Sequence, residues 1–132
     1  MIDIENEIFD ELSNLLEVKF NGINIVGEEQ NAPAIFPTVS IVETDNFTSQ
    51  SYADSSIEPF AEVTYMINIY VNSTQGKKTE AKKILTEIDK YMLNKGFFRN
   101  SKQPVSMNNT TLYRLVIRYN GVVSNDKDIY RR

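Results

Sequence analysis

The residues best suited to reactive chemistry are two acidic pairs, Glu28 with Glu29 and Asp126 with Asp128. Carboxylate oxygens are the ligands that Mg²⁺ prefers in proteins. Each pair falls in a predicted loop, and neither has a further acidic partner at a recognisable spacing. A metal-dependent small enzyme or ligand-binding domain is therefore an alternative rather than the main hypothesis, and we assign no metal ligand and no catalytic residue.

The sequence contains no cysteine and no histidine. Zinc sites, thiol nucleophiles, disulfides and histidine-based triads each need one of these residues. Acid and base catalysis also recruits histidine more often than any other side chain. We therefore expect a non-enzymatic protein.

The balance of charge argues against broad nucleic-acid binding. Eighteen Asp and Glu residues outnumber 14 Lys and Arg residues, which gives a net charge of -4. Affinity for nucleic acid comes largely from basic residues that displace counterions at phosphates. An RNA-binding α+β domain would also cluster aromatic and basic residues on its strands to stack bases. The predicted strands lack such a cluster.

Length and hydropathy indicate one domain made in the cytosol. The 132 residues fit a single hydrophobic core, and 41% of them are apolar. No apolar run approaches the roughly 20 residues that cross a bilayer. Residues 1–5 are acidic where a signal peptide is basic. We therefore expect no membrane partner.

Apolar periodicity predicts two amphipathic helices, at residues 3–20 and 77–95. The outward face of the first carries six acidic residues against one lysine, whereas the second contains six lysines against three acids. This asymmetry permits two arrangements. The helices are neighbours within one monomer, or the acidic helix of one copy approaches the basic helix of the next. The sequence does not choose between them.

Alternating apolar and polar residues predict the strands. They span 23–26, 34–45, 60–72 and the two arms of a hairpin, 104–107 and 111–123. Pro37 removes a backbone donor, so its strand either lies at a sheet edge or begins after the proline. The order of elements predicts a single α+β domain over residues 1–132. Its sheet is mainly antiparallel with about four strands, and both helices pack on one face.

Two segments are predicted to lie outside the core. Residues 46–59 form a Ser-rich stretch longer than an ordinary loop. It contains three large apolar side chains, Phe47, Tyr52 and Ile57. This composition favours a mobile arm that becomes ordered when these side chains bind a partner. A plain surface loop is the alternative. The charged segment 124–132 is predicted to be an extended C-terminal tail.

The sheet face opposite the helices is expected to be uncovered. Its mixture of apolar, hydroxyl and basic side chains is typical of a protein interface. We hypothesise that it meets another chain. The candidate interface residues, drawn from this face, the arm and the tail, are Phe47, Tyr52, Ile57, Met66, Tyr70, Arg114, Arg118, Tyr130 and Arg131.

The second half of the chain resembles the tail terminator, or tail completion, proteins of tailed bacteriophages and phage-derived tail particles. The resemblance covers roughly residues 60–132 and rests on the order and spacing of several segments. These are the strand EVTYMINIY at 62–70, GKK at 76–78 opening a helix, MLNKGF at 92–97, LYRLVIRYNG at 112–121 and the closing IYRR at 129–132. The N-terminal helix fits the same arrangement.

The resemblance implies a structural role with no cofactor and no reaction. It implies a homohexameric ring that caps the last ring of the tail tube, stops tube growth and joins the tube to the head side. The implied partners are further copies of the chain, the tail tube protein, a neck or connector protein and, in a contractile tail, the sheath. The implied location is the bacterial cytoplasm during assembly and then the virion or tail particle. Another small head-tail connector or neck protein is the alternative.

Overall fold

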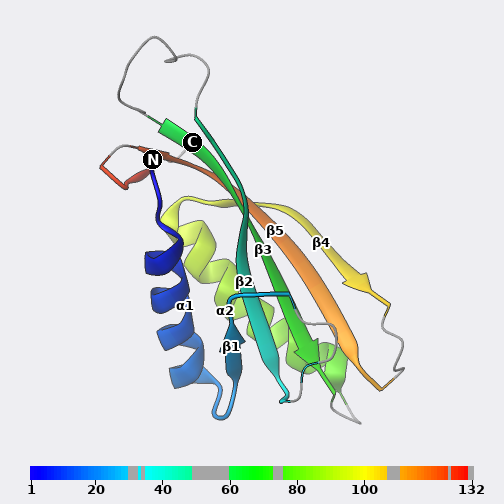
Figure 1. Cartoon of the computed structure of the whole chain (residues 1–132). Helices are drawn as coiled ribbons and strands as arrows, with labels where there is room; N and C mark the ends of the chain where they lie inside the picture. The colour runs from blue at the N-terminus through cyan, green and yellow to red at the C-terminus, as the bar shows by residue number, and fades with distance from the viewer. Residues whose placement is uncertain are drawn as a thin grey trace.

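The computed structural model describes residues 1–29, 33, 35–48, 60–72, 76–106, 111–124 and 126–130. These residues contain two helices and six strands (Figure 1). In chain order they are α1 (Glu5–Lys19), β1 (Asn24–Val26), β2 (Thr38–Thr48), β3 (Phe60–Val71), α2 (Lys77–Lys95), β4 (Phe98–Val105), β5 (Tyr113–Ser124) and β6 (Ile129–Tyr130). Among these residues, no helix is long and apolar enough to cross a membrane.

The strands form one sheet in the order β1-β2-β3-β5-β4, and β6 pairs with the end of β5. Every pairing is antiparallel except that of β1 with β2. The predicted α+β class with a mainly antiparallel sheet is confirmed. Within the described residues the sheet has six strands and not about four. β1 lies within the segment predicted at 23–26, whereas β6 was not predicted.

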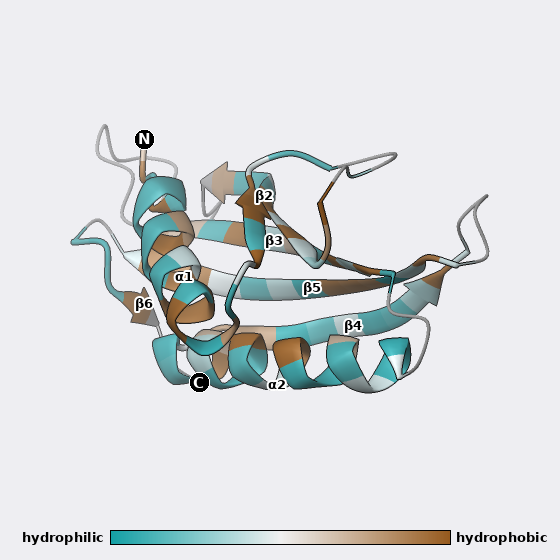
Figure 2. Ribbon diagram, turned by 90° about the horizontal axis from the view of Figure 1, so that it is seen from below, coloured by the Kyte–Doolittle hydropathy of each residue, from teal (hydrophilic) through white to brown (hydrophobic). Residues whose placement is uncertain are grey.

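Both helices pack on the same face of the sheet (Figure 2). Alternate residues of β3 and β5 point toward them, because successive side chains of a strand face opposite sides. The central core residues, which are less than 2% exposed, are Leu12, Leu16, Ile41, Tyr65, Ile67, Ile69, Ile84, Ile88, Met92, Ile117 and Tyr119. The periodicity of the sequence therefore predicted the inward side of each main element correctly.

The turn after α2 holds the helix against the sheet. Gly96 adopts the left-handed conformation with φ of 112°, and the amide N–H groups of Gly96 and Phe97 donate to carbonyls of the last helical turn. Phe97 then enters the core and meets the ring of Tyr65 edge-on, with 5.5 Å between centroids. Its ring lies so close to Gly121 that a Cβ there would come within 2.5 Å of it. Glycine at this position lets the aromatic ring pack on the backbone of β5.

Both segments predicted to lie outside the core differ from expectation. The first begins after residue 48 and not at residue 46, and part of the second packs against the core. β2 continues to Thr48, so residues 46–48 belong to the sheet and not to an arm, and the Asn46 amide donates to the Ile2 carbonyl at 2.8 Å. Residues 49–59, with Tyr52 and Ile57, lie outside the described residues. In the tail, Ile129 pairs with β5 and packs against the core, so the prediction that 124–132 extends away from the core is wrong for this part.

The first hairpin arm is also longer than predicted. It was expected at 104–107, whereas β4 starts at Phe98. Most of its side chains are exposed, because β4 is an edge strand with β5 as its single partner. Because so few of its side chains are buried, β4 lacks the alternation of apolar and polar residues from which a strand is predicted.

Candidate functional site

The sheet face opposite the helices divides into a covered half and an open half. The covered half comprises Thr38, Ser40, Asn68, Tyr70 and Val116, which are all at most 2% exposed. The prediction that the whole face is uncovered is therefore wrong for this half. Tyr70 in particular is buried within its own chain and is not available to a partner.

Residues 27–29, which follow β1, cross this half of the face (Figure 1). Glu29 comes three residues after β1, yet its carboxylate accepts a hydrogen bond from Arg114 on β5, so the segment crosses β2 and β3 (Figure 1). Arg114 also donates through Nε to the Asn68 side-chain oxygen at 2.9 Å, and Asn68 donates to Ser40 Oγ at 3.0 Å. The Arg114 guanidinium lies over the Tyr70 ring, 5.5 Å from its centroid. These hydrogen bonds link the crossing segment to β5, β3 and β2.

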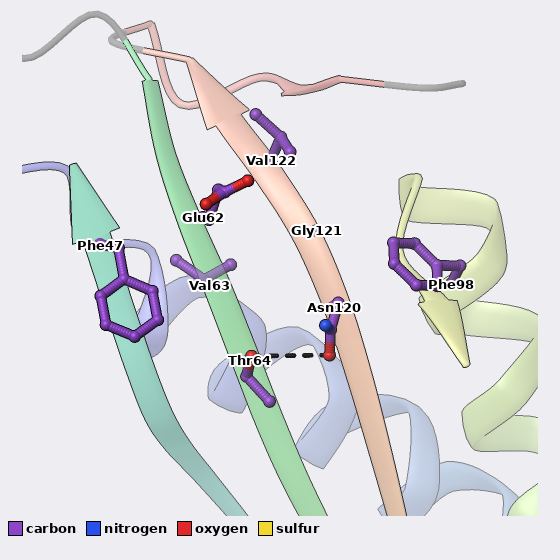
Figure 3. A pocket seen from close by; sticks show the side chains of 8 residues that line it. All are labelled: Phe47, Glu62, Val63, Thr64, Phe98, Asn120, Gly121 and Val122. Atoms are coloured by element: carbon purple, nitrogen blue, oxygen red, sulfur yellow. Dashed lines mark hydrogen bonds between the residues drawn. The ribbon is translucent and has the colours of Figure 1, made fainter. Parts of the chain in front are cut away.

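The open half contains a hollow of about 180 Å³ (Figure 3). Phe47 on β2 and Phe98 on β4 stand on either side of it, 58% and 42% exposed. Between them lie β3 and β5, whose Thr64 and Asn120 side chains form a hydrogen bond of 3.5 Å. The complete lining is Phe47, Glu62, Val63, Thr64, Phe98, Asn120, Gly121 and Val122.

Two large aromatic side chains exposed on one face are the most apolar feature of this half. Phenylalanine is usually buried, and an exposed pair flanking a hollow is a feature typical of surfaces that bind another molecule. The polar groups within it, Glu62, Thr64 and Asn120, offer hydrogen bonds that fix the orientation of that molecule. The arrangement is suited to binding.

No protein-family model and no curated protein sequence matches the chain.

The predicted interface residues are distributed unevenly over this face. Phe47 lies on β2 at the hollow of the open half, and not in an arm. Met66 and Arg118 are partly buried in the row between the two halves, where an Arg118 amino group contacts Met66 Sδ at 3.7 Å. The Arg114 side chain is only 15% exposed and binds Glu29 and Asn68 in the covered half. Tyr130 pairs with Val122 through its backbone at the far end of the open half.

Arg131, like Tyr52 and Ile57, lies outside the described residues. Phe98 was not predicted as an interface residue, although it follows the buried Phe97 directly. The signal was available, because two neighbouring strand residues face opposite sides, so only one of two adjacent phenylalanines can enter the core.

The acidic residues considered for metal binding are not brought together. Glu29 pairs with Arg114, and Asp126 and Asp128 are exposed in the turn before β6. Within the described part of the chain, the carboxylates close enough to share an ion are those of Asp3, Glu5 and Glu43, at the edge of β2. The Glu5 carboxylate already accepts a hydrogen bond from the Glu43 amide N–H at 3.2 Å, which occupies an edge donor that another strand would use.

Glu43 makes this edge sensitive to pH. Burial raises the pKa of its carboxyl above the ordinary value, the hydrogen bond from the Tyr65 hydroxyl opposes this rise, and the negative charge of Glu5 adds to it. Above the ordinary pKa the folded state therefore binds the Glu43 proton more readily than the unfolded state does. Stability contributed by this group is present at low pH and is lost as the pH rises through the folded-state pKa.

Glu43→Gln is accordingly expected to raise the Tm by about 2 °C at pH 7 and to give no gain at pH 4. Glutamine removes the charge but keeps an oxygen that accepts the Tyr65 hydroxyl. Thermal unfolding at the two pH values measures this, with the exposed Glu62→Gln as the control. A lower Tm for the Glu43 variant at pH 7 contradicts the assignment.

Proposed function

We propose that the protein is a structural subunit that assembles with copies of itself and acts as a tail terminator of a phage or phage-derived tail particle. The observation that carries the assembly role is the pair of exposed phenylalanines, Phe47 and Phe98, on two strands of the open half. A surface of this kind is stable in solution once a second chain covers it. The open half is the first candidate for that contact.

The particular role in the tail rests on the resemblance of residues 60–132 to tail terminators. In this role six copies form a ring that caps the end of the tail tube, stops its growth and joins it to the neck or connector. The partners are then the tube protein, the connector and, in a contractile tail, the sheath. The protein works in the bacterial cytoplasm during assembly and afterwards in the particle.

Deleting the gene in its native particle and imaging the tails tests this function. We expect tubes of uncontrolled, greater length that lack a cap and are not joined to heads. Normal tails contradict the proposal. Tails of normal length that fail to join heads support the alternative, another small connector or neck protein.

A further inference from the structure

The lysines at the start of α2 are arranged unfavourably within the monomer. Lys77, Lys78, Lys82 and Lys83 occupy its first two turns with Glu80 as the one acid among them. The N-terminal end of a helix carries the positive end of its dipole, which disfavours cations. Lys78 and Lys82 are also four residues apart, so two like charges stand on the same face.

The other half of α2 is neutralised by residues nearby. Lys95 pairs with Glu11 on α1 at 2.8 Å, Lys90 approaches Glu87 of its own helix at 3.8 Å, and Lys19 on α1 reaches the same Glu87 at 3.7 Å. Of the two arrangements that the sequence permits, pairing within the monomer therefore accounts for the C-terminal half of α2. It does not account for the N-terminal half.

Lys78, Lys82 and Lys83 are exposed and form no ion pair with any residue that the structure describes. We call these three residues the lysine stripe. The N-terminal half of α2, which carries the lysine stripe, lies at the end of the helical layer away from α1 (Figures 1 and 2).

The outer surface of α1 presents the complementary surface. Asp10, Asn14, Glu17 and Val18 are all exposed and fall on one side of the helix at spacings of four, seven and eight residues. Neither Asp10 nor Glu17 has an ion-pair partner within the described part of the chain. Val18, which is 84% exposed, adds apolar area beside them. We call these four residues the acidic stripe.

We propose that the lysine stripe of one copy binds the acidic stripe of the next copy. The two stripes are opposite in charge and lie on different helices, so one contact leaves the second stripe of each copy free for a further copy. Such a head-to-tail contact builds rings or filaments rather than isolated pairs. This inference rests on the proposed function, because it assumes that copies of the chain assemble.

The net charge of -4 favours a protein partner over nucleic acid for the lysine stripe. A contact between opposite charges also depends on salt, because exposed ion pairs are screened. We expect self-association to weaken at least about tenfold between 50 mM and 500 mM salt.

A charge-swap experiment tests the contact directly. The first variant, Lys78→Glu/Lys82→Glu/Lys83→Glu, makes both stripes acidic, and the second, Asp10→Lys/Glu17→Lys, makes both basic. Each alone is expected to remain monomeric in light scattering, since its stripes repel. An equimolar mixture is expected to assemble, because each stripe then meets its opposite on the other variant. Native mass spectrometry should find equal numbers of the two variants in each particle.

Lys90→Glu/Lys102→Glu/Lys127→Glu is the matched control, since it changes the net charge by the same amount as the first variant but leaves both stripes intact. It is expected to assemble like the wild type. The inference is overturned if either swapped variant assembles alone as well as the wild type, if their mixture stays monomeric, or if duplex DNA rather than a second copy binds the lysine stripe. A wild type that never assembles is a different result, because it contradicts the proposed function itself.

Discussion

Replacing both Phe47 and Phe98 with serine is expected to weaken assembly strongly without lowering the stability of the single chain. Both side chains are largely exposed in the single chain, 58% and 42%, so folding gains little from them. Burying a phenylalanine in an interface is worth about 1.5 to 3 kcal/mol. Losing two of them is expected to weaken each contact by roughly 100-fold to 10,000-fold. Light scattering over a concentration series measures the change.

Leu93→Ser is the matched control for this variant. Leu93 is a large apolar side chain of similar exposure, 47%, but it lies on α2 and not on the sheet face. Its replacement should leave assembly intact. If the Leu93 variant dissociates as much as the double phenylalanine variant, general surface hydrophobicity drives association and the open half is not the interface.

Arg114→Ala is expected to lower the free energy of unfolding by about 2 to 3 kcal/mol. The side chain is 15% exposed and joins the buried Asn68 to Glu29, which belongs to the segment crossing the sheet. Its removal leaves the Asn68 oxygen without this donor and takes the cation from the face of the Tyr70 ring. Urea unfolding measures the loss.

Arg118→Ala provides the comparison, because Arg118 lies four residues away on the same face of β5. An Arg118 amino group contacts the Met66 sulfur, which is a weak acceptor, so we expect a loss in the free energy of unfolding below about 1 kcal/mol. Equal losses for the two arginines would mean that Arg114 does not hold the crossing segment in place.

The sequence predicted the elements whose residues alternate between buried and exposed. β3 was predicted at 60–72 and spans Phe60–Val71, and α2 was predicted at its observed bounds, Lys77–Lys95. In both, apolar residues recur with the period of the element because one side packs on the core. Gly96 marked the end of α2 because its left-handed backbone favours glycine.

The covered half of the sheet could not be predicted in the same way. It depends on Glu29 meeting Arg114, two residues separated by 85 positions, and no local pattern encodes such a contact. The side chains of the covered half were read correctly as mixed polar and apolar. Such a mixture is found on a sheet face that is covered by the same chain and also on one that is covered by a partner chain. Composition alone therefore does not distinguish the two.

The open half was partly predictable. Phe47 was assigned to an interface, but as part of an arm, because the polar residues around it do not resemble a strand. The strand extends this far because the antiparallel pairing with β3 continues to Thr48 after a bulge between Glu43 and Asp45. A bulge shifts the alternation of inward and outward side chains by one residue, so the residues after it no longer fit the two-residue period by which a strand is predicted.

The mass of the wild-type protein in solution tests the central claim most directly. Light scattering of the purified chain at micromolar to near-millimolar concentration should give a closed species of six times 15.2 kDa, with the monomer appearing as salt is raised. A species that stays at 15.2 kDa over this whole range contradicts the claim that copies of the chain complete one another's surfaces.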